Sequence, residues 1–159
     1  FFDEQRMCRL YEKFLLEYYR KEHPKLSANA SQITWQLDDS ENQLLPKMQT
    51  DIMPSQENNI LIIDAKYYSH MTQRQYGTNT LHSNNLYQIF TYVKNKEFEL
   101  KNCEHTVSGM LLYAQTDEDI IPNNTYQMSG NQISVRTLNL NQDFSRIAES
   151  LDDIVKNYF

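Results

Sequence analysis

The chain has 159 residues, the length of one ordinary domain, and its 15 Lys and Arg against 21 Asp and Glu leave a formal net charge of −6. A domain that holds DNA by bulk charge alone is normally basic, so this charge disfavours that class. Only 3 Gly and 4 Pro occur and 40% of the residues are hydrophobic, which argues against a disordered linker and for a packed core. No apolar run approaches the roughly 20 residues of a membrane span, so no membrane partner is expected.

The two cysteines, Cys8 and Cys103, are far apart and show no CxxC spacing. A disulfide framework and a zinc–cysteine site are therefore both disfavoured, and a reducing, cytoplasmic location is expected. No basic segment followed by an apolar stretch marks a signal peptide. We expect a single domain over residues 1–159. Because the sequence begins at Phe1 rather than Met, we also expect it to be a C-terminal fragment of a longer subunit.

The first predicted element is an amphipathic helix. Apolar residues recur three and four positions apart from Met7 to Tyr18. This helix should end before Pro24, because a proline disfavours the helical conformation of the residue that precedes it. Two strands and then a turn are expected next, over residues 31–37, 47–53 and 54–59.

Residues 60–63 (ILII) form a continuous apolar run, which is typical of a strand covered on both faces. A polar loop with several aromatic residues is expected over 67–80. Ser83 or Asn84 should then cap a helix over residues 83–98. The rest of the chain predicts two strands and an amphipathic helix, over residues 106–114, 132–138 and 144–155.

The predicted element order is α-β-β-β-α-β-β-α. Three strands joined by short turns predict an antiparallel meander, whereas the helix over 83–98 predicts a crossover to a parallel neighbour. We therefore expect an α/β protein with a mixed sheet flanked by helices.

Two residues suited to catalysis stand at the end of the apolar run. Asp64 and Lys66 are two positions apart, so in a strand their side chains point to the same face. Asp51 lies on the preceding predicted strand, where a short turn lets it face Asp64 at the sheet edge. An unpaired carboxylate directly after an apolar run is costly, which argues that Asp64 has a partner. A strand-end Asp with a Lys in solvent is the alternative interpretation.

Two carboxylates and an ammonium in one place suit a hard divalent cation and a phosphate group. Asp51 and Asp64 would bind Mg²⁺, or Mn²⁺ in its place, and the carbonyl of Ala65 would add an oxygen ligand. Lys66 would orient the attacking water or neutralise the charge that grows on the phosphoryl oxygens.

Glu12 lies within the apolar arc of the first predicted helix, and the residues three and four positions on are both leucines, which offer it no partner. Glu17, in contrast, is flanked by Lys13 and Lys21 and should be a solvated salt-bridge residue. We expect Glu12 to contribute to the metal site, directly or through water. A buried, hydrogen-bonded structural glutamate is the alternative.

Gln88 and Tyr92 are one helical turn apart and share a face beside the apolar stripe of the helix over 83–98. From that position they can look onto the same sheet edge. On its own the QxxxY pattern is a weak signal.

Together these residues resemble the PD-(D/E)XK nuclease superfamily, whose core has the same αβββαβ order. Within it, the chain is most similar to the nuclease subunit of McrBC-type, methylcytosine-dependent restriction systems. The similarity covers about residues 5–115, and one departure is that Pro46 lies five residues before Asp51 rather than next to it. The segments that carry it are the opening helix LYEKFLLEYY, LLPKMQTDIM (44–53), ILIIDAKYY (60–68) and SNNLYQIFTYVKN (83–95).

The resemblance implies a restriction-endonuclease-like fold and an Mg²⁺-dependent deoxyribonuclease. It implies a double-stranded DNA substrate that contains 5-methylcytosine, and coupling to a separate AAA+ GTPase subunit of the McrB type. GTP would bind only that partner, since this chain has no glycine-rich phosphate loop. The N-terminal region that docks on the motor is expected to be missing from the fragment. The catalytic residues implied are Glu12, Asp51, Asp64, Lys66, Gln88 and Tyr92.

Two other functions stay open at this point. QxxxY also occurs in RecB-like repair and recombination nucleases, which need a DNA end. A nuclease fold kept as a catalytically silent interaction module is the non-enzyme alternative, although the complete Asp51/Asp64/Lys66 set argues against it. The loop over 67–80 could reach DNA through aromatic and basic side chains, or could be a loop without that role. Its candidate contacts are Tyr67, Tyr68, Arg74 and Tyr76.

Overall fold

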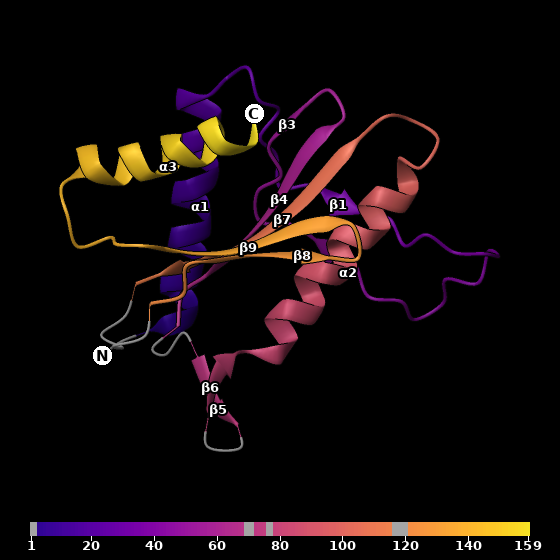
Figure 1. The fold of residues 1–159 in the computed structure, drawn as a ribbon, viewed down its shortest axis with the longest axis horizontal. Helices are drawn as coiled ribbons and strands as arrows, with labels where there is room; N and C mark the ends of the chain where they lie inside the picture. Colours follow the sequence, from indigo (N-terminus) through magenta and orange to yellow (C-terminus); the bar gives the residue numbers. More distant parts are fainter. Residues whose placement is uncertain (1–2, 69–71, 76–77, 116–120) are drawn as a thin grey trace.

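A mixed five-stranded sheet forms the centre of the computed structural model, which describes residues 3–68, 72–75, 78–115 and 121–159 (Figure 1). In this sheet the strand order is β3-β4-β7-β9-β8. Two helices, α1 and α3, cover one face, and α2 covers the other. The bounds are α1 Glu4–Glu22, β3 Ser55–Gln56, β4 Asn59–Lys66, α2 Ser83–Glu99, β7 Thr106–Ala114, β8 Asn124–Met128, β9 Asn131–Leu138 and α3 Phe144–Tyr158. The predicted α/β fold with a mixed, helix-flanked sheet is confirmed.

The parallel pair β4–β7 lies at the middle of the sheet. Its register runs from Asn59 opposite Thr106 to Lys66 opposite Tyr113. This is the parallel crossover through a helix that the sequence predicted. Residues 60–63 are buried on both faces, as their continuous apolar run indicates.

The side chains of β4 divide between two cores because they alternate along the strand. Leu61 and Ile63 pack with α1 and α3. Ile60 and Ile62 pack with α2. Asp64, two positions after Ile62, therefore points to the α2 face at the end where the strand leaves the core.

Gly109 allows α2 to lie close against β7. A Cβ added at this position would come within 2.8 Å of side-chain atoms of Ile89 and Val93, both on α2. A larger residue would push the helix away from the sheet. The glycine thus fixes the height of α2, which also carries Gln88 and Tyr92, above the strands.

The predicted antiparallel meander forms only in part: the segments pair antiparallel, but not as one continuous ladder. The strands expected over 31–37 and 47–53 shrink to β1 (Gln32–Ile33) and β2 (Met48–Gln49), which pair with each other in a separate two-stranded ribbon. After β2 the chain bends, and only single bridges continue, such as the one between Ile52 and Ile63. The short strand that pairs with β4 is β3, which lies inside the predicted turn over 54–59.

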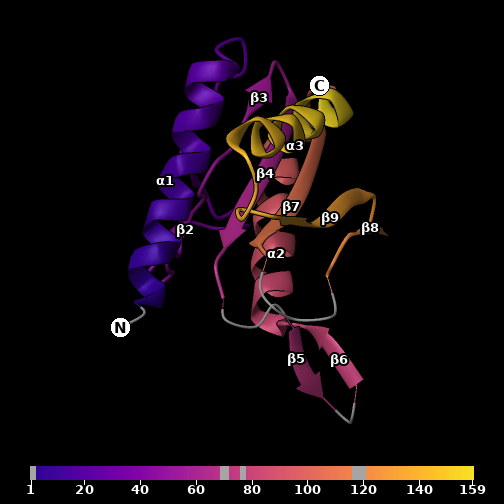
Figure 2. The same cartoon turned by 90° about the vertical axis from the view of Figure 1, so that its left-hand side faces the viewer.

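The predicted loop over 67–80 contains a β-hairpin, made of β5 (Thr72–Gln75) and β6 (Thr78–Leu81). Figure 2 shows that it extends beyond the N-terminal end of α2. The sequence analysis missed the two hairpin strands because they lack an apolar alternation, and it missed the edge strand β8 because only Tyr126 and Met128 alternate there. The N-cap of α2 is His82 rather than Ser83 or Asn84.

Candidate active site

The candidate site lies at the open edge of β4, near its carboxyl end. The antiparallel neighbour β3 covers only the first two residues of β4. Further along β4, a single antiparallel bridge joins Ile52 to Ile63. Beyond that bridge the backbone N–H of Ala65 donates to a side chain instead of a neighbouring strand, namely to Oδ2 of Asp51 at 2.8 Å. This edge lies between α1 on one face of the sheet and α2 on the other.

Asp51 sits in the bend after β2, not on a strand as the sequence predicted. Burial and then the neighbouring charge of Asp64 raise the pKa of Asp51 to about 8. Glu12 adds to this rise, while the bond from the Ala65 N–H opposes it. The two aspartates therefore lie close together, as expected, and without a cation the Asp51 carboxyl group is disposed to keep its proton.

Asp64 is 5% exposed, so its carboxylate is held almost entirely away from water. The Nζ atom of Lys66 lies 3.1 Å from Oδ1 of Asp64. The other oxygen, Oδ2, has no hydrogen-bond partner among the described residues. A buried, unpaired carboxylate oxygen is costly, and a bound cation would satisfy it.

Lys66 is held from two sides. Besides Asp64, its Nζ donates to Oε1 of Gln88 at 3.0 Å. Burial alone would lower the pKa of Lys66, but the Asp64 carboxylate holds that pKa above its ordinary value. Lys66 is therefore an ammonium at neutral pH, suited to stabilise negative charge rather than to accept a proton.

The QxxxY pair brings α2 into the site. Nε2 of Gln88 donates to the hydroxyl of Tyr92 at 3.1 Å, which leaves Oε1 of Gln88 for Lys66. Gln88 thus touches the lysine directly, whereas Tyr92 acts through Gln88. The two residues share a face that looks onto the end of β4, as the sequence predicted.

Glu12 reaches the site from α1. It is half-buried, and burial followed by the charge of Asp64 raises its pKa, while Lys66 lowers it. Glu17, in contrast, is exposed. Its ion-pair partner is Arg20, three positions on, at 3.4 Å, rather than the predicted Lys13 or Lys21.

The donor atoms of this site fit a hard cation such as Mg²⁺. Asp51 and Asp64 offer carboxylate oxygens, and the carbonyl of Ala65 leaves the strand on the same side as its N–H, toward Asp51. Within the described ranges, no three His, Cys, Asp or Glu side chains are placed to hold a metal ion by themselves. A cation here would combine two carboxylates, the carbonyl and water, which suits Mg²⁺ because it keeps several waters, and Glu12 would act through one of them.

A buried network beside Lys66 was missed by the sequence analysis. Tyr68 donates from its hydroxyl to Oδ1 of Asn85 at 3.1 Å, and Nδ2 of Asn85 donates to the hydroxyl of Tyr113 at 2.9 Å. Asn85 is only 4% exposed. Nothing in the sequence marks this asparagine, because its partners lie 17 and 28 positions away.

Whether Tyr67 and Tyr68 contact DNA stays a prediction, although contacts within the fold hold both side chains in place. Both are half-buried; Tyr67 packs edge-on against Tyr11, and Tyr68 is tied to Asn85. Apolar rings next to a core gain more from burial than from exposure. The side chain of Arg74 and the whole of Tyr76 lie outside the described residues.

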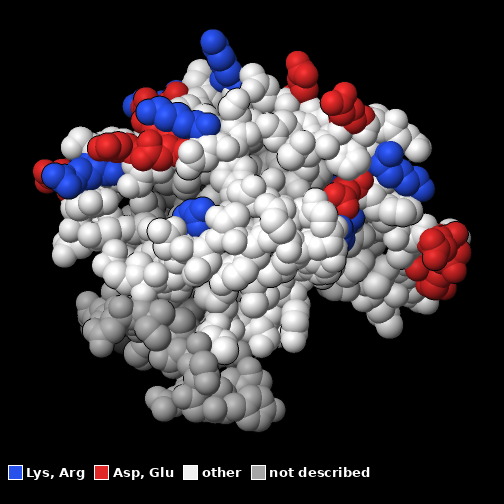
Figure 3. Space-filling view, viewed as in Figure 1, with Lys and Arg blue, Asp and Glu red and all other residues white. Residues whose placement is uncertain are grey.

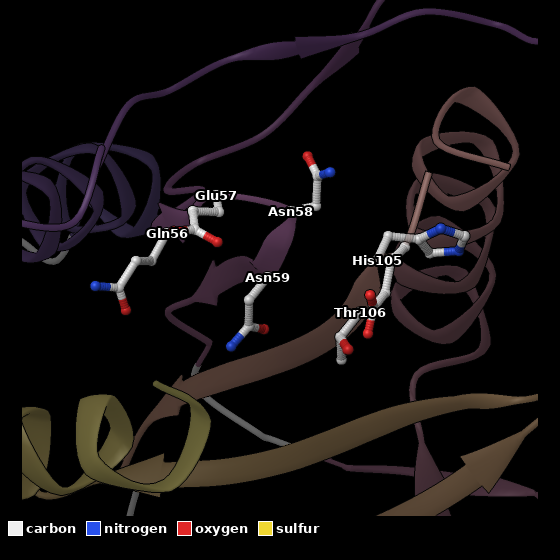
Figure 4. Close-up of a pocket in the computed structure, with 7 residues that line it drawn as sticks. Gln56, Glu57, Asn58, Asn59, His105 and Thr106 are labelled. Atoms are coloured by element: carbon white, nitrogen blue, oxygen red, sulfur yellow. The ribbon is translucent and has the colours of Figure 1, made fainter. Parts of the chain in front are cut away.

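A separate polar hollow lies at the other end of β4. Figure 4 shows Glu57 and Asn58 on the turn before β4, and His105 and Thr106 at the start of β7. These and neighbouring residues line a polar pocket of about 480 Å³. At roughly 3.3 Å per residue along a strand, this pocket is about 16 Å from Asp64, so it is separate from the carboxylate cluster.

The mixed sheet, with a helix on each side of the β4 edge, is compatible with a restriction-endonuclease-like fold. The family model described as "McrBC 5-methylcytosine restriction system component" matches residues 5–114. The chain belongs to this family, which confirms the resemblance seen in the sequence.

A curated relative from Escherichia coli (strain K12), "Type IV methyl-directed restriction enzyme EcoKMcrBC", is 36% identical over 159 residues. The match covers 98% of this chain and 44% of the relative, so the chain spans less than half the length of that protein. No helix among the described residues is long and apolar enough to span a bilayer.

Proposed function

We propose that this chain is the DNA-cleaving part of an McrBC-type restriction system, a metal-dependent deoxyribonuclease that hydrolyses phosphodiester bonds. The observation that carries the proposal is the buried cluster of Asp51, Asp64 and Lys66, in which one oxygen of Asp64 has no partner. Family membership supports it, since the family model is named for a 5-methylcytosine restriction system. Hydrolysis would leave 5′-phosphate ends.

Each residue has a distinct part in this chemistry. Asp51 would give up its proton and, together with Asp64, hold Mg²⁺, with Ala65 adding its carbonyl. Bound Mg²⁺ would supply an activated water and neutralise charge on the phosphate. Lys66, kept protonated by Asp64 and aimed by Gln88, would stabilise the charge that develops on the phosphoryl oxygens.

We further propose that a GTPase partner of the McrB type delivers DNA with modified cytosine to this site in the cytoplasm. The net charge of −6 opposes a polyanion. On the face shown in Figure 3, blue and red side chains are interspersed, and that face carries no broad basic surface. The isolated chain should therefore bind duplex DNA weakly, with a Kd of about 10⁻⁴–10⁻⁶ M at physiological salt.

A RecB-like nuclease that needs a DNA end is a second candidate, favoured by the contact between Gln88 and Lys66. Circular DNA separates the two, because an endonuclease cuts it and an end-dependent exonuclease leaves it intact. A silent nuclease-like module is disfavoured by the complete set of Asp51, Asp64 and Lys66.

The experiment is plasmid cleavage with methylated and unmethylated supercoiled DNA, in the presence of Mg²⁺, with and without the GTPase subunit and GTP. Cutting of methylated plasmid that depends on both the partner and GTP is expected. Lys156→Ala, which changes a lysine 77% exposed on α3, serves as the charge-matched control for Lys66→Ala. Equal cutting by wild type and Lys66→Ala would contradict the proposed mechanism.

A further inference from the structure

A groove adjoins the candidate site on the α2 side of the sheet. It lies between α2 and the ribbon of β1 and β2, and its volume is about 430 Å³. Trp35 and Lys47 come from the ribbon side. Tyr87, Gln88 and Tyr92 come from successive turns of one face of α2. The mechanism proposed above uses Gln88 and Tyr92 but leaves the other residues of this groove without a role.

Hydrogen bonds hold the two walls of the groove in place. The indole N–H of Trp35 donates to the carbonyl of Pro46 at 2.6 Å, which fixes the ring against the start of β2. The backbone N–H of Gln36 donates to Oδ1 of Asn95 on α2 at 2.9 Å, which ties the ribbon to the helix. A groove whose walls are already fixed loses little conformational entropy when a ligand binds.

The groove combines aromatic rings with one positive charge. Tyr87 is 68% exposed, so most of its aromatic ring faces water. Trp35 is half-buried at the opposite wall. Among the described residues that line the groove, Lys47 is the single charged one, and none is a carboxylate. In a chain with a net charge of −6, such a place is suited to a ligand that is both flat and anionic.

Gln88 connects the groove to the chemistry, because it lines the groove and also accepts a hydrogen bond from Lys66. We propose that the groove binds one unstacked nucleotide of the DNA strand next to the bond that is cut. Its base lies against Trp35 and Tyr87, and Lys47 faces its phosphate. This inference rests on the proposed nuclease function and adds a substrate subsite to it.

The chain carries its own probe, because Trp35 is its only tryptophan. Its fluorescence is followed while a short single-stranded oligothymidylate, and separately the same strand in a duplex, is added to the 159-residue chain without metal. Stacking of a base on the indole should quench the emission in a saturable way. The single strand should quench at lower concentration than the duplex, because its bases are already unstacked.

Three variants locate the effect. Tyr87→Ala should weaken the apparent affinity about tenfold, because stacking on an aromatic ring is lost. Tyr87→Phe should bind like wild type, because it keeps the ring. Phe98→Ala is the matched control, since Phe98 is also on α2, is 48% exposed and lies away from the groove, so it should leave the affinity unchanged.

Cleavage is measured in parallel with Mg²⁺, so that the two proposals can fail separately. Absence of quenching, or equal quenching in wild type and Tyr87→Ala, overturns the subsite, even if the chain cuts DNA. Quenching that Tyr87→Ala abolishes supports the subsite, and it does so even if Mg²⁺ yields no cleavage and the nuclease proposal falls. Quenching that Phe98→Ala weakens as much as Tyr87→Ala also overturns the subsite, because the effect would then not be local.

Discussion

The two ends of β4 differ in how far their carboxylates are exposed to water. At its amino end lies the polar pocket of about 480 Å³, where Glu57 and Glu104 are exposed to water. At its carboxyl end Asp64 is 5% exposed, pairs with Lys66 and shares its surroundings with Asp51. Exposed carboxylates are solvated and need no partner, whereas buried ones destabilise the fold unless something compensates them. Buried charged side chains, and not the volume of a pocket, therefore distinguish the candidate active site of this molecule.

The largest effect on cleavage is expected when the ammonium group of Lys66, beside the buried Asp64, is removed. Lys66→Ala should reduce cleavage by a hundredfold or more, equivalent to about 3 kcal/mol of barrier, because the charge on the phosphoryl oxygens loses its stabilising ammonium. The measurement is the rate of plasmid nicking at saturating Mg²⁺. Circular dichroism checks that the variant is folded, because loss of the Lys66 side chain leaves the buried Asp64 without its ion-pair partner.

The matched control at the exposed end is Glu104→Gln, which removes a charge from the other pocket. It should cleave at the wild-type rate. If Glu104→Gln slowed cleavage as much as Lys66→Ala, the contrast between the two ends would be wrong.

Metal binding should depend on the same end. Asp64→Asn should weaken Mn²⁺ binding by about a hundredfold, because it removes one of two carboxylate ligands, and loss of even an outer partner costs 10- to 100-fold. Isothermal titration calorimetry of the metal-free chain measures this. Glu57→Gln at the exposed end should bind Mn²⁺ like wild type, and unchanged binding in Asp64→Asn would remove the metal assignment.

Stability should depend on pH through Asp51. Its pKa rises from an ordinary value near 4 to about 8 in the metal-free fold, because burial and Asp64 disfavour the charged form. Between these values the folded chain holds a proton that the unfolded chain releases, so stability falls as pH rises from about 4 to about 8. We expect a loss on the order of 2 kcal/mol, less than the full shift because water reaches part of this site.

Thermal denaturation at a series of pH values measures this dependence. Asp51→Asn should flatten the fall, and Mg²⁺ should raise the melting temperature more at pH 8 than at pH 5, since metal and proton compete for the same carboxylates. A metal-free wild-type chain that is more stable at pH 8 than at pH 5 would show that the aspartates do not share a buried site.

The smallest expected effect on cleavage is at Glu12, which is compared with Glu17 on the same helix, α1. Glu12→Gln should slow cleavage about tenfold, because Glu12 interacts with the charges of Asp64 and Lys66. Glu17→Gln should leave the rate unchanged and alter stability by about 0.5 kcal/mol or less, since its pair with Arg20 is solvent-exposed. Similar mild effects at both positions would return Glu12 to a structural role.

Periodicity predicted the parts of the fold that bury apolar side chains. The spacing from Met7 to Tyr18 predicted α1, and the apolar runs predicted the parallel pair β4 and β7. The hairpin of β5 and β6 was not predictable in this way, because its strands have mostly polar sequences. The edge strand β8 was missed because it is short and only Tyr126 and Met128 pack against the core.

The site was predictable where its contacts are local. Two-residue alternation placed Asp64 and Lys66 side by side, and helical spacing paired Gln88 with Tyr92. The bend at Asp51 was not predictable, because there the Asp51 side chain, 14 positions before Ala65, accepts a hydrogen bond from the Ala65 N–H in place of a backbone carbonyl. Hydrogen bonds between separate segments of the chain can be identified only once the fold is known.

The most direct test of the central claim is cleavage of a methylated supercoiled plasmid by the full-length subunit with its GTPase partner, GTP and Mg²⁺, comparing wild type with Asp64→Asn. If the buried carboxylates hold the catalytic metal, wild type linearises the plasmid and Asp64→Asn leaves it supercoiled while still assembling with the partner. Cleavage by Asp64→Asn at the wild-type rate would contradict the account.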